Sequence, residues 1–259
     1  VSQLDSLFIQ GVHNPLLRDN TAKASCAVTT NNKKSNHGGD HFMIPFFFGE
    51  DWTKVLPLVA LQYHDVEIRI KCRDGYIPVG TPKVWGNYIY LDTDERKYFT
   101  DNEHELLITQ TQHQLASNTD TEIDLTYFNH PVKSVHLVSG KATGDEWDSE
   151  FTFQKSSLYI NGVPLFEDTS NIYHHTIVPE MHSTDLPDDV LEDLPTFTWP
   201  FCLNLSKMQP TGTLNFSRID NAKLALVGPT GGNALHRIYA VNYNVLRIKN
   251  GMAGVAFGN

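Results

Sequence analysis

The sequence contains few of the groups that thiol-redox, zinc-binding or membrane proteins need. Its 259 residues hold three cysteines, which are widely spaced and form no CxxC pair. So sparse and odd a set predicts reduced thiols in a cytoplasmic folding environment rather than the disulfides of a small secreted domain. No apolar run approaches the ~20 residues of a membrane-spanning helix. We therefore expect neither a zinc ribbon nor a transmembrane segment.

Positive charge is also scarce. The 20 basic residues are outnumbered by 30 acidic ones, and the formal net charge is −10. A protein that binds the nucleic-acid backbone needs a positive footprint, and no basic cluster here is longer than Lys33-Lys34. Direct, specific binding of nucleic acid is therefore not expected. The 40% hydrophobic content instead fits a compact chain that can bury a core without disulfides or metal.

Helical periodicity is rare, and alternation of apolar and polar residues dominates. Such alternation predicts β-strands with one buried face. Because few of the connections between them are short enough for tight hairpins, the pattern favours a Greek-key sandwich over an up-and-down barrel. The predicted strands cover residues 66–72, 88–92, 104–114, 122–128, 132–138, 157–161, 196–205, 213–216, 222–227 and 239–248.

Two of these strands carry further predictions. Pro200 cannot donate to a β-ladder, so the strand at 196–205 is expected at a sheet edge or with a bulge. In the last strand the apolar parity shifts between Val245 and Leu246, which predicts a β-bulge. The apolar residues of TFTWPFCLNL (196–205) share one parity and are predicted to face the core: Phe197, Trp199, Phe201, Leu203 and Leu205.

Only short helices are expected. Asp92 stands three residues before Glu95, the spacing of a capping box, and predicts a helix to about Asp101. Residues 170–178 are expected to form another turn or two. In VLPLVALQYHDVEIRIK (55–71), the apolar run around Pro57 predicts a buried turn or short helix that leads into an alternating strand.

The segment STDLPDDVLEDLP (183–195) has five acids, two prolines and no base. It is typical of a solvated loop. A cation-binding loop is the alternative, but the regular acidic spacing and central Gly of an EF-hand are missing.

Twelve histidines raise the question of a metal site. A His-x-His pair is absent, as is an HExxH helix, and adjacent histidines on a strand point to opposite sides. Solvated or hydrogen-bonded histidines are the better interpretation, and no metal ligand is predicted. The groups considered were His37, Asp40 and His41, and then His174, His175, Glu180 and His182.

Motifs of catalysis are absent as well. There is no GxSxG nucleophile elbow, and Thr230-Gly231-Gly232 lacks the GK[ST] of a phosphate-binding loop. Asp120 and Glu122 would suit glycoside chemistry only at the right separation. We therefore expect no enzymatic activity, no catalytic residue and no cofactor.

The sequons at Asn204 and Asn215 fall in or beside predicted strands and are interpreted as chance matches.

Five stretches carry a more specific signal than periodicity. They are FFFGEDWTKVLPLVALQYHDVEIRI (46–70), YIYLDTDERKYF (88–99), HPVK (130–133), TGTLNFSRIDNAKL (211–224) and YAVNYNVLRIKNGMAGVAF (239–257). Together, in this order, they resemble the major capsid proteins of large icosahedral DNA viruses, a group that includes iridoviruses and phycodnaviruses.

This resemblance implies an all-β fold, a double jelly roll of two eight-stranded sandwiches. Residues 1–78 would be the C-terminal part of the first jelly roll plus the start of the linker. Residues 79–259 would be the linker end and the complete second jelly roll. The linker itself is expected near 74–85, where Gly and Pro gather. Because family members are longer, the first roll would be only partly covered.

The resemblance also implies a function. The chain would be a structural major capsid protein whose homotrimers form pseudo-hexagonal capsomers of an icosahedral viral shell. Its partners would be other copies, neighbouring capsomers and minor capsid proteins. It would reside in the virion after folding and assembly in the host cytoplasm.

The residues leave one alternative function open, since jelly rolls host many activities. A carbohydrate-binding or cupin-like jelly-roll domain could stack sugars on exposed aromatics. The candidates are Trp52, Trp85 and Trp147, each of which could equally anchor a core or an interface.

Overall fold

The computed structural model describes residues 46–49, 52–69, 86–117, 120–138, 152–182, 196–205, 207, 209–230 and 236–258. Its strands form two antiparallel sheets. The larger sheet has the order β1 (His104–Ala116), β9 (His236–Lys249), β3 (Pro131–Val138) and β6 (Thr196–Pro200). Two short strands extend it: β7 (Leu214–Asn215) pairs with β3, and β10 (Met252–Val255) pairs with β9.

The smaller sheet faces the larger one. Its order is β2 (Glu122–Asp124), β8 (Ala222–Val227), β4 (Lys155–Ile160) and β5 (Val163–Ser170). Hydrogen-bonded neighbours within each sheet are mostly distant in sequence, and the chain crosses repeatedly between sheets. Eight strands in two packed four-stranded sheets make a jelly roll. The predicted all-β jelly-roll sandwich is confirmed, with the second roll complete.

One apolar core fills the space between the sheets. Trp199 and Leu224 are both fully buried and come from opposite sheets. Phe153 packs beside Trp199 with ring centroids 6.4 Å apart. The remaining core is formed mainly by aliphatic and aromatic side chains of the inner faces, including Leu125, Val132, Val135, Leu137, Leu158, Phe197, Phe216 and Ile238.

Most predicted strands exist, with some errors in extent. The regions 104–114, 132–138, 157–161, 213–216, 222–227 and 239–248 all contain strands. β5 and β10 were not predicted. The strand predicted at 88–92 is wrong, as is the described part (66–69) of the strand predicted at 66–72, because neither segment pairs with another strand among the described residues. Alternation alone does not supply a partner for the backbone groups.

The prediction for 196–205 is correct at its start and wrong at its end. Phe197, Trp199 and Leu205 are buried, and Phe201 packs partly buried against the core. Leu203, however, is 76% exposed. The strand ends at Pro200, so residues 201–203 bend away and the alternation no longer applies. β6 lies at an edge of the larger sheet, as Pro200 predicted.

The predicted bulge between Val245 and Leu246 is also wrong. β9 pairs with β1 in unbroken register from His104 opposite Ile248 to Ala116 opposite His236. The irregularity in this part of the sheet lies instead in β3, between Val132 and Ser134. The parity changes because the far half of β9 leaves the sandwich, where burial no longer selects one face.

Helices are short, as predicted. α3 (Thr93–Asp101) begins with the expected capping box between Asp92 and Glu95. A π-helical turn (Tyr173–Ile177) continues into α4 (Val178–His182). Three 3₁₀ turns cover Phe47–Gly49, Trp52–Lys54 and Leu58–Ala60, and a fourth covers Phe216–Arg218.

Some predictions concern residues that the structure does not describe. These are the acidic segment 183–195, the predicted linker at 74–85, and His37, Asp40 and His41.

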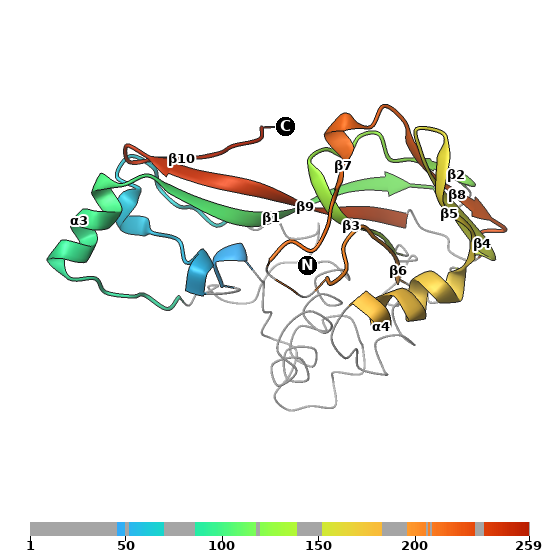
Figure 1. Ribbon diagram of the computed structural model, residues 1–259, viewed down its shortest axis with the longest axis horizontal. Coiled ribbons are helices and arrows are strands. Elements are labelled where there is room, and N and C mark those ends of the chain that lie inside the picture. Colours follow the sequence, from blue (N-terminus) through green and yellow to red (C-terminus); the bar gives the residue numbers. More distant parts are fainter. Residues whose placement is uncertain are drawn as a thin grey trace, which may run out of the picture.

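The molecule is elongated. Figure 1 shows the sandwich at one end and the long β1–β9 pair running out of it, with β10 alongside the far half of β9. At the other end of this ribbon lie α3 and the segment 52–69. We call residues 52–69, 86–101 and 250–257, with the adjoining ends of β1 and β9, the outer lobe.

Candidate functional site

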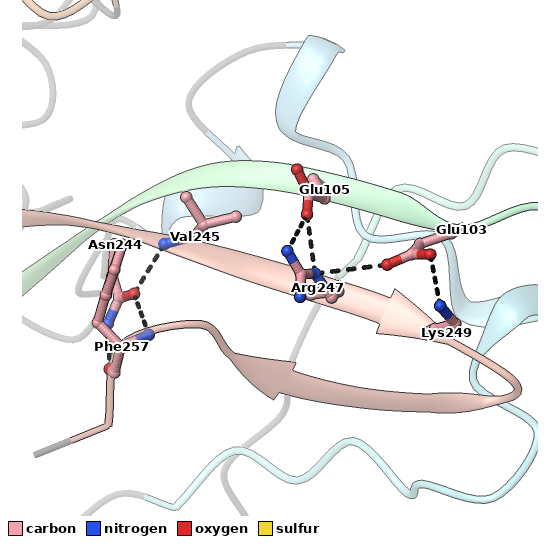
Figure 2. A network of polar contacts seen from close by, with 7 residues as sticks. All are labelled: Glu103, Glu105, Asn244, Val245, Arg247, Lys249 and Phe257. Atoms are coloured by element: carbon pink, nitrogen blue, oxygen red, sulfur yellow. Dashed lines mark hydrogen bonds and ion pairs between the residues drawn. The ribbon is translucent and has the colours of Figure 1, made fainter.

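Alternating charges line the ribbon where it enters the outer lobe. Arg247 on β9 lies opposite Glu105 on β1, and its Nε donates to the Glu105 carboxylate over 2.8 Å. Lys249 binds Glu103, the residue before β1, over 2.9 Å, so two acids at the start of β1 meet two bases on β9 (Figure 2). The hydrogen bond from Lys249 lowers the pKa of Glu103, and the hydrogen bond to Glu105 raises the pKa of Arg247. All four side chains are exposed, so the ladder sets strand register more than it adds stability.

A buried asparagine holds the C-terminal segment beside β9. Asn244 is 2% exposed, and its Nδ2 donates to the side-chain oxygen Oε1 of Gln110 and to the backbone oxygen of Phe257, each over 2.9 Å. Its Oδ1 accepts from the backbone N–H of Val245 and of Phe257 (Figure 2). The side-chain amide thereby joins β1, β9 and the segment that follows β10.

Tyr63 and His64 dock on the β9–β10 turn. Tyr63 N donates to Gly251 O over 3.0 Å, and Ala253 N donates to His64 Nδ1 over 3.0 Å. Gly251 has φ +77°, and a Cβ there would lie 2.6 Å from the Tyr63 ring. Only glycine suits both the turn and this close approach. The outer lobe therefore joins parts of the chain that are far apart in sequence.

The outer lobe has little core of its own. α3 contains no buried residue, and Tyr90 is 89% exposed. Isolated exposed apolar residues are ordinary, but this lobe carries many of them. They are Trp52, Val55, Leu58, Tyr63, Val66, Ile68, Tyr88, Ile89, Tyr90, Tyr98, Met252, Val255 and Phe257. The predicted buried turn at 55–60 is thus largely wrong, because only Ala60 of its 3₁₀ turn is buried.

Three of the histidines considered as metal ligands form hydrogen bonds to backbone oxygens instead. His174, His175 and His182 each place Nδ1 within 3.0 Å of a backbone oxygen of residues 196–202. Glu180 is exposed on the same helical segment. Within the described ranges, no three metal-ligating side chains lie close enough to share an ion. Burial lowers the pKa of His174 to about 4, so its imidazole is neutral at neutral pH.

A second buried imidazole lies on the larger sheet. His136 is 1% exposed and bonds Ser134 Oγ over 2.8 Å and Thr198 Oγ1 over 3.0 Å. Burial lowers its pKa to about 3, and the charge of Lys133 acts in the same direction. Although serine and histidine are adjacent here, both are fully buried on β3, and the contact of His136 with Thr198 joins β3 to β6.

The remaining sequence candidates stay apart. Asp120 accepts a hydrogen bond from the Ser117 N–H, whereas Glu122 binds Lys223 on the outer face of the smaller sheet. A shallow groove there includes Tyr159, but the Lys223 ammonium lies over that ring, 6.0 Å from its centroid. The ring face that a sugar would use is therefore occupied.

The tryptophans considered for sugar binding and the asparagines of the two sequons lie in different parts of the chain. Trp52 is exposed on the outer lobe, while Trp85 and Trp147 lie outside the described residues. At the sequons, Asn215 caps a 3₁₀ turn through Ser217, and Asn204 Oδ1 accepts from Lys207 N.

Two further sequence expectations concern membranes and thiols. In the part of the chain that the structure describes, no helix has the length and apolar content to cross a membrane. Cys202 is a buried free thiol, and burial raises its pKa. Cys26 and Cys72 lie outside the described residues.

The strand order and the two packed sheets define a jelly-roll sandwich, and comparison with known families identifies the family. The profile described as "Large eukaryotic DNA virus major capsid protein" matches residues 95–254. The profile described as "Major capsid protein N-terminus" matches residues 4–92. The first match alone covers more than half of the chain. The chain therefore belongs to the family of major capsid proteins of large eukaryotic DNA viruses.

This chain covers different shares of its individual relatives. The major capsid protein of Pyramimonas orientalis virus is 36% identical over 244 residues, covering 83% of this chain and 60% of that protein. That of Paramecium bursaria Chlorella virus 1 is 29% identical over 299 residues, covering 84% and 67%. The solved "PBCV-1 virus capsid, quasi-atomic model" superposes with a TM-score of 0.68 at 25% identity, over 99% of this chain and 78% of that chain. The chain thus spans about 60% of the first relative.

Proposed function

We propose that this chain is a structural major capsid protein and that three copies form a capsomer of an icosahedral viral shell. The observation that carries the proposal is the family match over residues 95–254. The relatives are named as capsid proteins, and none of their names describes a catalytic activity. The molecule acts by surface complementarity in this proposal, and it requires no cofactor.

The outer lobe is the surface that this function uses in our proposal. Its apolar side chains are exposed, and α3 buries none of its residues in the single chain. A patch of this kind gains stability when another protein surface removes it from water. We place a neighbouring copy of the chain against it. The charged ladder and the Asn244 contacts would then hold the lobe in a defined position relative to the sandwich.

The domain division belongs to the same proposal. Residues 1–78 form the C-terminal part of a first jelly roll with the start of the linker, and residues 79–259 form the linker end and the second roll. Two separate profiles, matched over residues 4–92 and 95–254, support a division of the chain into two parts. So do the nine strands, β1 to β9, found between residues 104 and 249.

The proposed setting follows from the proposed role. The protein resides in the virion, after folding and assembly in the host cytoplasm. Its partners are other copies within the capsomer, neighbouring capsomers and minor capsid proteins. Interfaces of this kind combine an apolar centre with a polar, wet rim, and the outer lobe offers both.

Substitutions on the outer lobe test the proposal. Val66→Asp and Ile68→Asp place a charge on the exposed apolar surface without touching the core of the roll. Val227→Asp and Leu165→Asp are matched controls, because they carry similarly exposed aliphatic side chains on the smaller sheet. Light scattering over a concentration series should show self-association weakened at least tenfold, about 1.4 kcal/mol, in the lobe variants only. Equal association in all four variants would contradict this use of the lobe.

The carbohydrate-binding alternative is weaker in this structure. Tyr159, the aromatic side chain in the groove of the smaller sheet, is covered by Lys223, whereas Trp52 is 80% exposed on the outer lobe. Titration with common mono- and disaccharides at millimolar concentration should leave the tryptophan fluorescence of the chain unchanged. Saturable binding that Trp52→Ala removes would favour the alternative.

A further inference from the structure

The outer edge of β6 is one end of the larger sheet, and the direction of its backbone groups can be assigned. On an antiparallel strand, successive residues direct their N–H and C=O groups to opposite sides. Phe201 N donates to Lys133 O on β3 over 2.9 Å, so residue 201 faces into the sheet. Its even-numbered neighbours from 196 to 202 therefore direct their backbone groups outward, where a further strand would add.

Three imidazoles occupy these outward positions. His175 Nδ1 lies 3.0 Å from Thr196 O, and His174 Nδ1 lies 3.0 Å from Thr198 O. His182 Nδ1 lies 2.9 Å from Cys202 O. A carbonyl oxygen can only accept, so Nδ1 carries the proton in all three rings. The imidazoles thus bond alternate carbonyls along one strand edge.

The fourth outward position has no bond to a histidine. It is Pro200, which has no backbone N–H and cannot donate to an added strand. Beyond it, Leu205 N donates to His182 O over 2.6 Å, which fastens the end of α4 to the chain leaving β6. Every outward residue from 196 to 202 is therefore either bonded to a histidine or is proline.

The helical segment is held firmly enough to act as a cover. His174 is fully buried, stacks on Trp199 with centroids 4.6 Å apart, and bonds Thr169 Oγ1 through Nε2 over 2.6 Å. His175 packs on Phe197 at 5.5 Å. The same rings that meet the strand edge therefore also anchor the segment to the core and to β5.

We propose that residues 173–182 form an edge cap, which prevents a second copy of this chain from adding a strand to β6. An uncovered sheet edge is a template for pairing with another chain, and natural proteins block such edges. A shell protein reaches high local concentration during assembly, so an open edge would compete with the proper contacts. With the β6 edge covered, association is left to other surfaces, the outer lobe among them. This inference concerns the roll alone and does not depend on trimer formation.

The tautomer of the histidines tests the geometry in the unmodified protein. Free neutral histidine in water carries its proton mostly on Nε2, whereas the edge cap requires Nδ1–H in His174, His175 and His182. Nitrogen-15 correlation spectra of the full chain at neutral pH distinguish the two forms. We expect Nδ1–H in all three rings. A proton on Nε2 alone in His175 or His182 would overturn the proposal.

Substitution tests the consequence. The double variant His175→Phe/His182→Leu keeps apolar volume but removes two donors, and we expect at least a tenfold larger fraction of species above the parent's own oligomer. His175→Asn/His182→Asn keeps an N–H near the position of Nδ1 and should behave like the parent. His113→Phe changes an exposed histidine on β1, at the opposite side of the larger sheet from β6, and serves as the control.

The outcomes separate clearly. A folded Phe/Leu variant whose size distribution equals that of the parent would overturn the edge cap. Larger species in both double variants alike would also overturn it, because the donor would then be irrelevant. If the Phe/Leu variant does not fold, the tautomer of the parent decides.

Discussion

Asn244 and Phe257 are joined by two hydrogen bonds through a single side-chain amide. Nδ2 of Asn244 donates to the Phe257 carbonyl over 2.9 Å, and its Oδ1 accepts the Phe257 N–H over 3.3 Å. Since Ala256 N also donates to Val245 O over 2.8 Å, the C-terminal segment extends the sheet beside β9. A buried amide whose oxygen and nitrogen are both bonded fixes one arrangement of these strands.

Removing this amide should loosen the C-terminal segment. Asn244→Ala leaves the Gln110 side chain and the Phe257 backbone groups without their partner, a loss of about 1–3 kcal/mol. We expect faster amide exchange at Ala256 and Phe257, with β3 unchanged. Asn221→Ala, at an exposed turn of the smaller sheet, is the control. Unaltered exchange in Asn244→Ala would contradict the assigned contact.

Trp199 and Leu203 should respond in opposite ways to truncation. Trp199 is fully buried between the sheets, so Trp199→Ala should lower the free energy of unfolding by about 3–5 kcal/mol. Leu203 is 76% exposed, so Leu203→Ala should change it by less than about 0.5 kcal/mol. Chemical denaturation measures both. Similar losses in the two variants would show that residue 203 belongs to the core after all.

Stability should fall as the solution is acidified below neutral pH. His136 and His174 have native pKa values of about 3 and about 4 because burial disfavours the charged ring. In the unfolded chain both return to about 6.5, so the unfolded state binds more protons between about pH 6.5 and about pH 4. Each group then removes up to about 1.4 kcal/mol of stability per pH unit in that window.

Denaturation at about pH 7 and about pH 5 tests this dependence. A His174→Phe variant that folds should lose stability less steeply than the parent, whereas His113→Phe should follow the parent. Identical pH profiles for the parent and His174→Phe would show that His174 does not titrate as described.

The outer lobe should open more readily than the roll. Segments 52–69 and 86–92 have no strand partners among the described residues, whereas β3 and β9 lie inside a sheet. Amide exchange of the chain alone should therefore be fast in these segments and slow in the sandwich. Equal, strong protection of both in a monomer would show that the N-terminal region closes by itself. The partial-roll assignment would then be wrong.

Most strands of the roll can be predicted from the sequence. Each buries one face or both faces in the core, and this burial leaves a regular apolar pattern. Period-two alternation identifies β8, whose Ala222, Leu224 and Leu226 are all buried. Turn chemistry identifies the helix start at Asp92. β5 was missed because its residues are mostly exposed, and its Pro164 and acidic Glu167-Asp168 interrupt the pattern.

Contacts between residues that are distant in sequence were harder to predict, because no local pattern marks the two partners. Asn244 sits in an apolar alternation, and nothing local marks it as a partner of Phe257. The Asn250-Gly251 pair is a hairpin signal that could have predicted the β9–β10 turn. His174 and His175 were correctly interpreted as hydrogen-bonded, but their partners on β6 lie more than twenty residues away.

The mass of the particle in solution tests the central claim most directly. One chain has a mass of 29.2 kDa, so a homotrimer would have three times that mass. Light scattering with size separation, on the unmodified chain at micromolar concentration, should give the trimer or larger closed assemblies built from it. A monodisperse species of 29.2 kDa across the whole concentration range would contradict the proposed capsomer.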